Sequence, residues 1–380
     1  MSDLRDRLRV LMLGWEDPDR IHGGLGVASA ALADALGEVT DLSYWFPSSL
    51  PASGQGSYQE KRFPVALPAY AHGEDAYGPE LRRAWELYTQ AVIKEGLRTH
   101  PELIHAHDWM TFPAAGILAK ALDIPLVYHV HSIAPDREET PGGLAWETEQ
   151  QWLPKADMVL TVSDYTAAQL ISRFDIEPDR VHVLRHGKPE IVPYRTQKPF
   201  SEKLVVFIGR MTWQKGPHHF LNMALRLHAE RPDLRFVMAG EGDQWASVLQ
   251  TIARHRAGLR IQAPGRMTRD QIFDLLSMAD LLVMTSESEP LGLVAVEAAH
   301  FDVPMILPPH CGAAELFPDA PVLAPHDTDH LCETLVSLID NPKKRKAQVK
   351  QNQARIEQMT WESSASELLT SYAHLFMTGS

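Results

Sequence analysis

Short apolar runs alternate with longer amphipathic stretches along the whole chain. The apolar runs of the first half fit strands, and stretches such as GLGVASAALADALG and DYTAAQLISRF place their apolar residues at helical spacing. Strands that alternate with helices predict parallel sheets with right-handed crossovers. We expect the strands of the first half at 9–14, 101–107, 125–131, 156–163 and 180–187.

The alternation stops once and then restarts. The segment 188–202, KPEIVPYRTQKPFSE, contains three prolines and no periodicity, which is typical of a linker. Beyond it we expect strands at 203–210, 234–242, 259–265, 279–288 and 303–308, and an amphipathic helix at 361–376. The pattern predicts an α/β fold of two doubly wound, Rossmann-like domains. We divide the chain into a first domain (1–190), a linker (191–202), a second domain (203–358) and a closing helix (359–380).

Composition narrows the class of protein. The 380 residues are 44% hydrophobic and 22% charged, as in ordinary globular proteins, and the net charge of −13 argues against nucleic acid or an anionic membrane as a partner. Two cysteines cannot form a disulfide framework, so we expect free thiols. We find no apolar run of membrane-span length and no signal-peptide pattern at the start. We therefore expect a cytoplasmic protein, with peripheral membrane attachment as an alternative; the oligomeric state stays open.

Polar and glycine-rich stretches follow the expected strands, where open parallel sheets bind their ligands. The GGLG stretch, with Gly23 and Gly24, can present backbone N–H groups to an anion at a helix start, although a turn without a ligand explains it equally well. The loop GRMTWQKG places Arg210 and Lys215 at the edge of the second sheet. Two cations there can neutralise a leaving diphosphate without a metal; two solvated surface cations are the alternative.

Two acids stand eight positions apart in the stretch that begins SESEPLGLVAVEAAH. Glu289 precedes a predicted helix that begins near Gly292, and Glu297 lies one to two turns inside that helix. Backbone N–H groups of Leu291 and Gly292 can bind phosphate. Taken alone, Glu289 could be a carboxylate favoured by the dipole of a helix start, and Glu297 could be an exposed helical glutamate. Their spacing together with Gly292 favours a functional interpretation.

Alternating histidines end two expected strands, in HAHDW (105–109) and HVHS (129–132). Such a pattern invites a zinc site, but no cysteine or clear fourth ligand accompanies it, and hydrogen bonds to a polar ligand fit better. The D-x-D sequences at 17–19 and 327–329 lie in turn-like contexts. We therefore predict no metal site.

Taken together, GGLG, GRMTWQKG, MAGEGD, the E-x7-E pair and the tail TWESSASELLTSY resemble the retaining glycosyltransferases of family 4, which have the GT-B fold. HAHDW adds a likeness to bacterial glycogen synthases. The resemblance covers nearly the whole chain. It implies transfer of a hexose from a nucleotide-diphosphate sugar to a hydroxyl acceptor, with no cofactor and no metal, and a closing helix that packs on the first domain.

The resemblance also implies roles for individual residues. It assigns the donor sugar to Glu289 and His131, the ribose to Glu297, and the diphosphate to Arg210 and Lys215. The remaining donor-binding positions and the acceptor-side position that it implies are Gly23, Gly24, Leu291, Gly292, Leu293, Arg266, Met267 and, on the acceptor side, Asp108.

Two departures from the family pattern stand out. Ile21 replaces the lysine that glycogen synthases carry two positions before the glycine pair, and Cys311 replaces the first glycine of the pair before Glu315. The first argues against glycogen synthase itself. An epimerase or phosphorylase of the same fold, or a non-catalytic subunit of a transferase, remains an alternative; a dehydrogenase does not fit, since the G-x-G-x-x-G fingerprint is missing.

Overall fold

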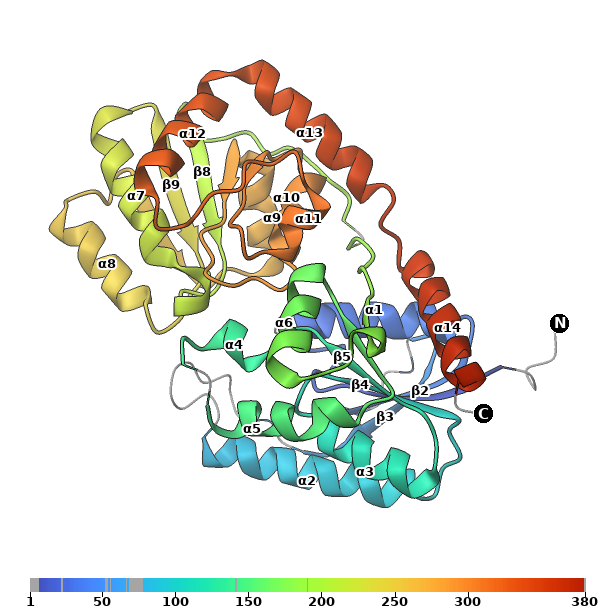
Figure 1. Ribbon diagram of the computed structural model, residues 1–380. Coiled ribbons are helices and arrows are strands. Elements are labelled where there is room, and N and C mark those ends of the chain that lie inside the picture. The colour runs from blue at the N-terminus through green and yellow to red at the C-terminus, as the bar shows by residue number, and fades with distance from the viewer. Residues whose placement is uncertain are drawn as a thin grey trace. The chain divides into compact units, whose positions relative to one another are not determined.

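The computed structural model describes residues 7–21, 23–51, 54, 56–65, 67, 78–140, 142–189 and 191–378. These residues form two compact units, each built on a parallel sheet (Figure 1). The first unit takes in residues up to Pro135, Thr140–Gly187 and Met359–Ser380, and the second Asp136–Glu139 and Lys188–Gln358. The prediction of a doubly wound α/β fold is confirmed.

The first unit contains a seven-stranded sheet in the order β3-β2-β1-β4-β5-β6-β7. Its strands are β1 (Arg9–Leu13), β2 (Asp41–Pro47), β3 (Gln59–Phe63), β4 (Leu103–His107), β5 (Leu126–Val130), β6 (Met158–Thr161) and β7 (Val181–Val183). Sequence analysis missed β2 and β3. The edge strand β3, QEKRF, is too polar to stand out as an apolar run, because an edge strand pairs with a neighbour on one side only and tolerates charged residues.

Helices cover both faces of this sheet. They are α1 (Gly24–Gly37), α2 (Pro79–Gly96), α3 (Phe112–Leu122), α5 (Gly143–Trp152), α6 (Asp164–Phe174) and α14 (Trp361–Thr378), with short 3-10 turns at Leu153–Lys155 and Pro178–Arg180. The short helix α4 (Ala134–Arg137) has its first two residues in this unit and its last two in the second. One hydrophobic cluster joins α2, α3 and α5 to the sheet, and a second joins α1 and α14 to the opposite face.

Helix α14 completes the core of the first unit although it ends the chain. Leu368 and Tyr372 are fully buried in the cluster that contains Met12 and Leu36. The Ser364 hydroxyl donates to the Arg185 carbonyl oxygen at 2.7 Å. Burying a large apolar side chain contributes about 1.5–3 kcal/mol, so α14 stabilises this unit substantially.

The second unit contains a five-stranded sheet in the order β10-β9-β8-β11-β12. Its strands are β8 (Lys203–Ile208), β9 (Leu234–Ala239), β10 (Ile261–Gly265), β11 (Leu281–Val283) and β12 (Met305–Ile306). Its helices are α7 (Pro217–Glu230), α8 (Trp245–Arg254), α9 (Arg269–Met278), α10 (Leu293–His300), α11 (Gly312–Leu316), α12 (Thr328–Asp340) and α13 (Pro342–Ile356), with a 3-10 turn at Trp213–Lys215. All five strands were predicted, each longer than observed.

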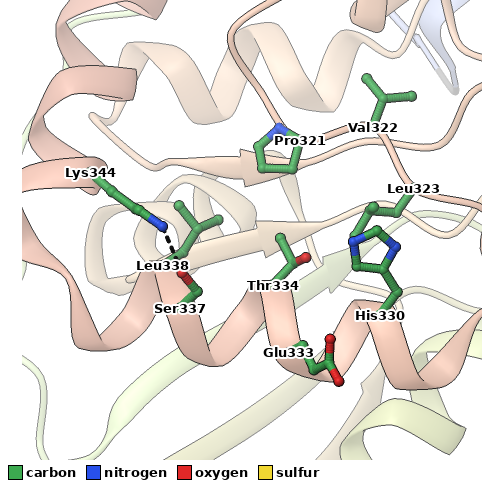
Figure 2. Close-up of a pocket in the computed structure, with 9 residues that line it drawn as sticks. All are labelled: Pro321, Val322, Leu323, His330, Glu333, Thr334, Ser337, Leu338 and Lys344. Carbon is green, nitrogen blue, oxygen red and sulfur yellow. Dashed lines mark hydrogen bonds between the residues drawn. The ribbon is translucent and has the colours of Figure 1, made fainter.

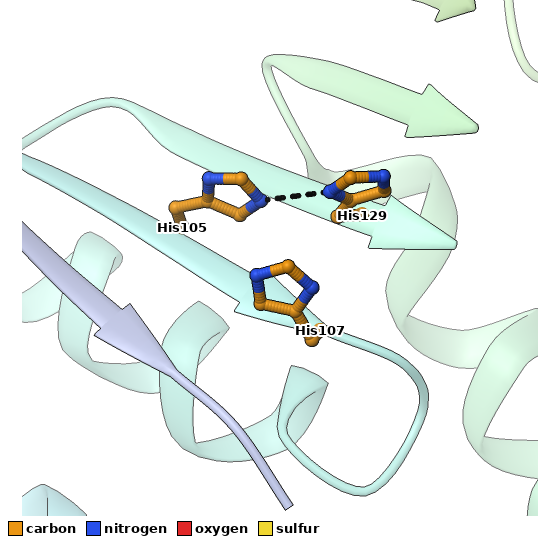
Figure 3. A group of neighbouring side chains, drawn as sticks. All are labelled: His105, His107 and His129. Carbon is orange, nitrogen blue, oxygen red and sulfur yellow. Dashed lines mark hydrogen bonds between the residues drawn. The ribbon is translucent and has the colours of Figure 1, made fainter. Parts of the chain in front are cut away.

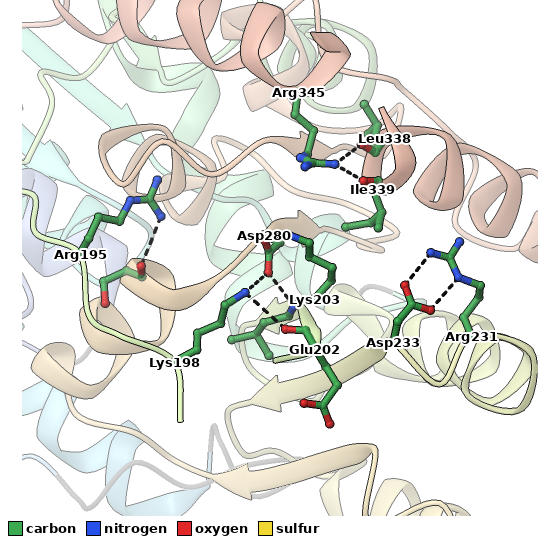
Figure 4. A network of polar contacts seen from close by, with 12 residues as sticks. Arg195, Lys198, Glu202, Lys203, Arg231, Asp233, Asp280, Leu338, Ile339 and Arg345 are labelled. Carbon is green, nitrogen blue, oxygen red and sulfur yellow. Dashed lines mark hydrogen bonds and ion pairs between the residues drawn. The ribbon is translucent and has the colours of Figure 1, made fainter. Parts of the chain in front are cut away.

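The proline-rich segment after Gly187 has no helix or strand among its described residues, and polar contacts hold it on the second unit (Figure 4). Lys198 and Lys203 both form ion pairs with Asp280, the residue immediately before β11. Arg195 donates to the Ser277 carbonyl oxygen at 3.2 Å. Asp280 also accepts the backbone N–H of Leu204 at 2.9 Å, which ties the segment to the first strand of the unit.

Candidate functional site

The loop after β8 carries the two cations that the sequence singled out. Arg210 is exposed, and its guanidinium donates to the Gln214 side-chain oxygen at 3.0 Å. Lys215 closes the short 3-10 turn, and Gly216 follows at φ +58°. A Cβ at position 216 would lie 2.2 Å from the Thr285 carbonyl oxygen, so only glycine lets this loop approach the end of β11 so closely.

Lys215 and Glu289, which are 74 positions apart, form an ion pair in the second unit. The Lys215 side chain is 20% exposed to solvent and the Glu289 side chain is 9% exposed. The Ser286 hydroxyl also donates to the Glu289 carboxylate, at 3.3 Å. The Coulomb attraction within a pair of such low exposure is stronger than in a surface pair, because less water screens it. The fold thus brings together two residues that the sequence assigned to sugar and diphosphate.

The backbone around Glu289 is fixed on both sides. The N–H of Glu289 donates to the His310 carbonyl oxygen at 2.8 Å, and its own carbonyl oxygen accepts from the Gly312 N–H at 3.0 Å. Gly292 then adopts φ +85°, and a Cβ there would lie 3.1 Å from the Ala313 Cβ and 3.3 Å from the Cys311 sulfur. This left-handed turn lets α10 begin immediately after the carboxylate loop.

The N-terminus of α10 offers backbone N–H groups without a competing side-chain cap. Gly292 is the N-cap residue and, having no side chain, supplies no capping hydrogen bond, and the first turn contains no acid. Unsatisfied N–H groups and the helix dipole make such an end suitable for phosphate. Leu293 is the first helical residue, and Leu291 precedes the cap.

Glu297 lies inside α10, largely shielded from solvent. Its side chain retains 17% exposure and pairs with Arg269 at 3.5 Å. Burial raises the pKa of Glu297 above its ordinary value, and the charge of Arg269 opposes that rise. The surface-glutamate alternative considered for Glu297 is therefore wrong. Arg266 and Met267 follow the end of β10, the first exposed and the second half-buried.

Cys311, one of the two residues that depart from the family pattern, is buried beside this loop. Burial raises the pKa of its thiol to about 12, with the Glu289 charge adding to the effect. A thiol of such high pKa stays protonated at neutral pH and is a poor nucleophile. Cys311 therefore acts here as a small packing group against Gly292.

In the first unit, the glycine-rich turn already has a carboxylate partner. The Gly23 N–H donates to Glu16 at 3.2 Å, and Gly24 is the first residue of α1. A Cβ at Gly26 would lie 2.5 Å from the same carboxylate. Sequence analysis did not single out Glu16, since nothing local connects it with the turn. An anion bound to this turn would meet the negative charge of Glu16.

Asp108 and His131 are linked in the same unit. Asp108 follows β4 at φ +56°, a left-handed conformation that aspartate tolerates better than most residues, and its carboxylate accepts the His131 backbone N–H at 2.7 Å. The imidazoles of His107 and His131 are joined by a nitrogen–nitrogen contact of 2.8 Å. The two predicted residues therefore share one strand-end region, and their assigned roles stay predictions.

Five histidines gather on the sheet face that α14 covers. His105 and His107 lie on β4, His129 lies on β5 and His131 follows it, and His186 follows β7; part of the group is drawn in Figure 3. Neighbouring rings have centroids 4.4–5.8 Å apart. His186 was not predicted, because it has no histidine two positions away and stands more than 50 positions from the others.

Burial keeps this cluster neutral. It lowers the pKa of His105 to about 3 and that of His186 to about 4, and it holds the pKa values of His107, His129 and His131 well below the ordinary value. Protonating one ring would also place a charge beside the others, which lowers several of these values further.

A surface pocket lies apart from all these residues. Its volume is about 510 Å³, and it contains none of the predicted site residues (Figure 2). Its one lining cation, Lys344, donates to the Ser337 hydroxyl at 2.9 Å. It is lined by Pro321, Val322, Leu323, His330, Glu333, Thr334, Ser337, Leu338 and Lys344. One cation and no glycine-rich turn make it a poorer diphosphate site than the β8–α10 region.

Two family models match this chain and together span most of it. The model described as Glycosyltransferase Family 4 matches residues 17–188, and the model Glycosyl transferases group 1 matches residues 193–355. The chain is a family-4-like glycosyltransferase of the GT-B fold. No helix among its described residues is long and apolar enough to span a membrane.

Curated relatives and solved structures resemble this glycosyltransferase over most of its length. The glycogen synthase of Mycobacterium tuberculosis is 29% identical over 361 residues, covering 88% of this chain and 87% of that protein. The alpha-maltose-1-phosphate synthase of Mycolicibacterium smegmatis is 27% identical over 405 residues, covering 96% and 99%.

Among solved structures, the sucrose-phosphate synthase of Thermosynechococcus elongatus matches with a TM-score of 0.79 at 18% identity, covering 98% of this chain and 100% of that one. Anabaena HepE in complex with UDP and glucose matches with a TM-score of 0.73 at 18% identity, covering 96% and 99%. At this identity the structural likeness establishes the fold.

Proposed function

We propose that this glycosyltransferase moves a hexose from a nucleotide-diphosphate sugar to a hydroxyl acceptor, with retention of the anomeric configuration and without a catalytic metal. The observation that carries the proposal is the Lys215–Glu289 pair beside the uncapped start of α10. A cation and a helix N-terminus can bind a diphosphate, and a carboxylate can accept hydrogen bonds from sugar hydroxyls. The names of the relatives support a sugar substrate, and the HepE complex supports a uridine diphosphate donor.

In the proposed reaction, the bond between the anomeric carbon and the diphosphate oxygen breaks, and its electron pair leaves with the diphosphate. The acceptor oxygen bonds to the anomeric carbon on the face that the diphosphate leaves, and the acceptor proton passes to the released diphosphate. Arg210, Lys215 and the α10 N–H groups stabilise the developing negative charge. Preorganised cations can supply this stabilisation in place of a metal.

Donor binding would rearrange the ion pair that the free protein contains. Lys215 would turn from Glu289 to the diphosphate, and the released carboxylate would accept hydrogen bonds from sugar hydroxyls. Negative charge close to the anomeric carbon also favours an oxocarbenium-like transition state. Glu297 would bind the ribose, Arg266 and Met267 would border the base, and Gly292 and Leu293 would contact phosphate.

In the first unit, His131 would contact the donor sugar near the reaction centre and Asp108 would lie on the acceptor side. The Asp108–His131 hydrogen bond supports this assignment, since it fixes the backbone of one residue through the side chain of the other. Gly23 and Gly24 would bind donor phosphate, and the Glu16 carboxylate would then have to release the Gly23 N–H.

The test is a panel of UDP-, ADP- and GDP-sugars, each incubated with candidate hydroxyl acceptors while nucleotide release is measured. We expect release that depends on one donor base and on an acceptor, and an unchanged anomeric configuration in the NMR spectrum of the product. Interconversion of the donor sugar without release would indicate an epimerase. Donor binding without turnover on any acceptor would favour a non-catalytic subunit.

A further inference from the structure

The histidine cluster of the first unit contains nitrogen atoms that the protein itself does not satisfy. In the described part of the chain, the buried Nε2 atoms of His107 and His129 and both ring nitrogens of His186 have no hydrogen-bond partner. His129 is fully buried, and His186 keeps 3% of its exposure. Buried polar atoms in native proteins are nearly always paired, so a group of them indicates a missing ligand.

We propose that His129, His131 and His186 bind one divalent transition-metal ion, such as Zn²⁺, through their imidazole nitrogens. One nitrogen from each of the three residues lies within 4.8 Å of the other two. Around a tetrahedral zinc the ligand nitrogens lie roughly 3.3 Å apart, since each Zn–N distance is about 2.0–2.1 Å. The three side chains therefore need to draw together by at most about 1.5 Å. Three imidazoles leave one coordination position open.

A second set of three histidines has the same spacing but is less suitable. His105, His107 and His129 also offer nitrogens within 4.8 Å of one another (Figure 3). His105, however, uses both nitrogens, one with the Tyr372 hydroxyl at 2.5 Å and the other with His129 Nδ1 at 3.3 Å. All three residues are fully buried, whereas His131 is partly exposed and gives an ion a route of entry.

The existing hydrogen bonds orient the proposed ligands. If His105 donates Nδ1–H to the Tyr372 oxygen, its Nε2 accepts from His129 Nδ1–H, and the Nε2 lone pair of His129 is left for the metal. If His131 donates Nε2–H to His107 Nδ1, its own Nδ1 lone pair is left in the same way. Metal-binding histidines characteristically donate their second nitrogen to such partners. The Asp108 carboxylate on the His131 backbone supplies a nearby negative charge.

This inference changes the expectation drawn from the sequence, which found no complete ligand set in HAHDW and HVHS. The third ligand is His186, which only the tertiary structure brings to the cluster. A metal on His131 would occupy a side chain that the proposed function assigns to the donor sugar, so the ion would oppose transfer. That consequence rests on the proposed function, whereas the binding test below does not.

The experiment titrates Zn²⁺ and, separately, Co²⁺ into chelator-treated protein that carries no histidine tag. Calorimetry with Zn²⁺ should give one equivalent bound, and Co²⁺ should give the visible absorption of a four-coordinate site. His186→Leu should weaken binding at least about tenfold, whereas the exposed His100→Leu, the matched control, should bind as wild type does.

A second variant keeps the test decisive should His186→Leu fail to fold. Tyr372→Phe removes only the hydroxyl that orients His105, and it should lower the affinity for Zn²⁺ by less than the roughly 10–100-fold that follows loss of a direct partner of a ligand, because Tyr372 acts on His129 through His105. Far-ultraviolet circular dichroism establishes which variants are folded. No uptake by the wild type would overturn the proposal, and so would wild-type affinity in whichever of His186→Leu and Tyr372→Phe is folded.

Discussion

Mild acid should destabilise the first unit through its buried histidines. In the folded protein burial lowers the pKa of His105 to about 3 and that of His186 to about 4. In the unfolded chain both return to about 6.5. The unfolded state therefore binds more protons below pH 6.5, and the free energy of unfolding falls as the pH falls from about 6.5 toward the folded pKa values.

The size of the effect follows from these pKa values. At pH 5 the pH lies about 1.5 units below the pKa of a histidine in the unfolded chain. Protonation then stabilises the unfolded state by about 2 kcal/mol per histidine, at about 1.4 kcal/mol per unit. His105 and His186 both stay neutral in the folded protein at that pH, so together they should cost about 4 kcal/mol between pH 7.5 and pH 5. His107, His129 and His131 shift in the same direction.

The measurement is urea unfolding followed by tryptophan fluorescence, at pH 7.5 and pH 5 in the presence of EDTA. All of the nine tryptophans except Trp213 and Trp245 lie in the first unit, so the signal reports mainly on that unit. With a slope of about 2 kcal/mol per M urea, the loss from one histidine corresponds to a midpoint shift of about 1 M.

Acid also neutralises part of the net charge of −13, and the reduced self-repulsion stabilises the fold, opposite to the effect of the histidines. This charge effect is nearly the same in every variant, so comparing His186→Leu with the wild type isolates the contribution of the histidine. Between the two pH values this variant should lose about 2 kcal/mol less than the wild type. His100→Leu, which alters an exposed histidine of the same unit, should follow the wild type. Parallel pH dependence in the wild type and His186→Leu would refute the reasoning.

Three further predictions concern the second unit. Glu289→Gln should lower turnover by about 10²-fold or more with little change in nucleoside diphosphate affinity, measured by calorimetry; equal losses of both would contradict its sugar-binding role. Gly292→Ala should cost about 1–2 kcal/mol of stability, since its φ of +85° is left-handed, and should weaken donor binding. Gly258→Ala is the control, because a Cβ there meets only one atom, at 4.0 Å. Transfer should persist in EDTA without added metal, and its loss, with recovery on adding Mg²⁺ or Mn²⁺, would refute the metal-independent mechanism.

The alternation of apolar runs and amphipathic stretches determined the two-sheet architecture. Buried parallel strands are continuous apolar runs, and helices packed on a sheet keep one apolar stripe, so both can be identified from sequence alone. This worked for every strand of the second sheet and for β1, β4, β5, β6 and β7 of the first. It failed for the interior strand β2 and for β3, whose edge position tolerates charged residues.

The candidate donor residues could also be selected from sequence, because Arg210, Lys215, Glu289 and Glu297 stand in short motifs beside strand ends. The sequence did not show that Lys215 and Glu289 pair, or that Arg269 meets Glu297. Such pairs depend on which strand ends lie side by side, and strand order is set by the packing of the whole sheet rather than by local pattern.

The histidine cluster shows the same division. The sequence placed His105 with His107 and His129 with His131, since residues two apart on a strand share one face. Only the tertiary structure added His186 and Tyr372, which come from a loop after β7 and from the last helix. Long-range contacts of this kind arise because the apolar faces of the sheet must be covered by other elements. The covering elements also determined which histidine nitrogens are shielded from solvent.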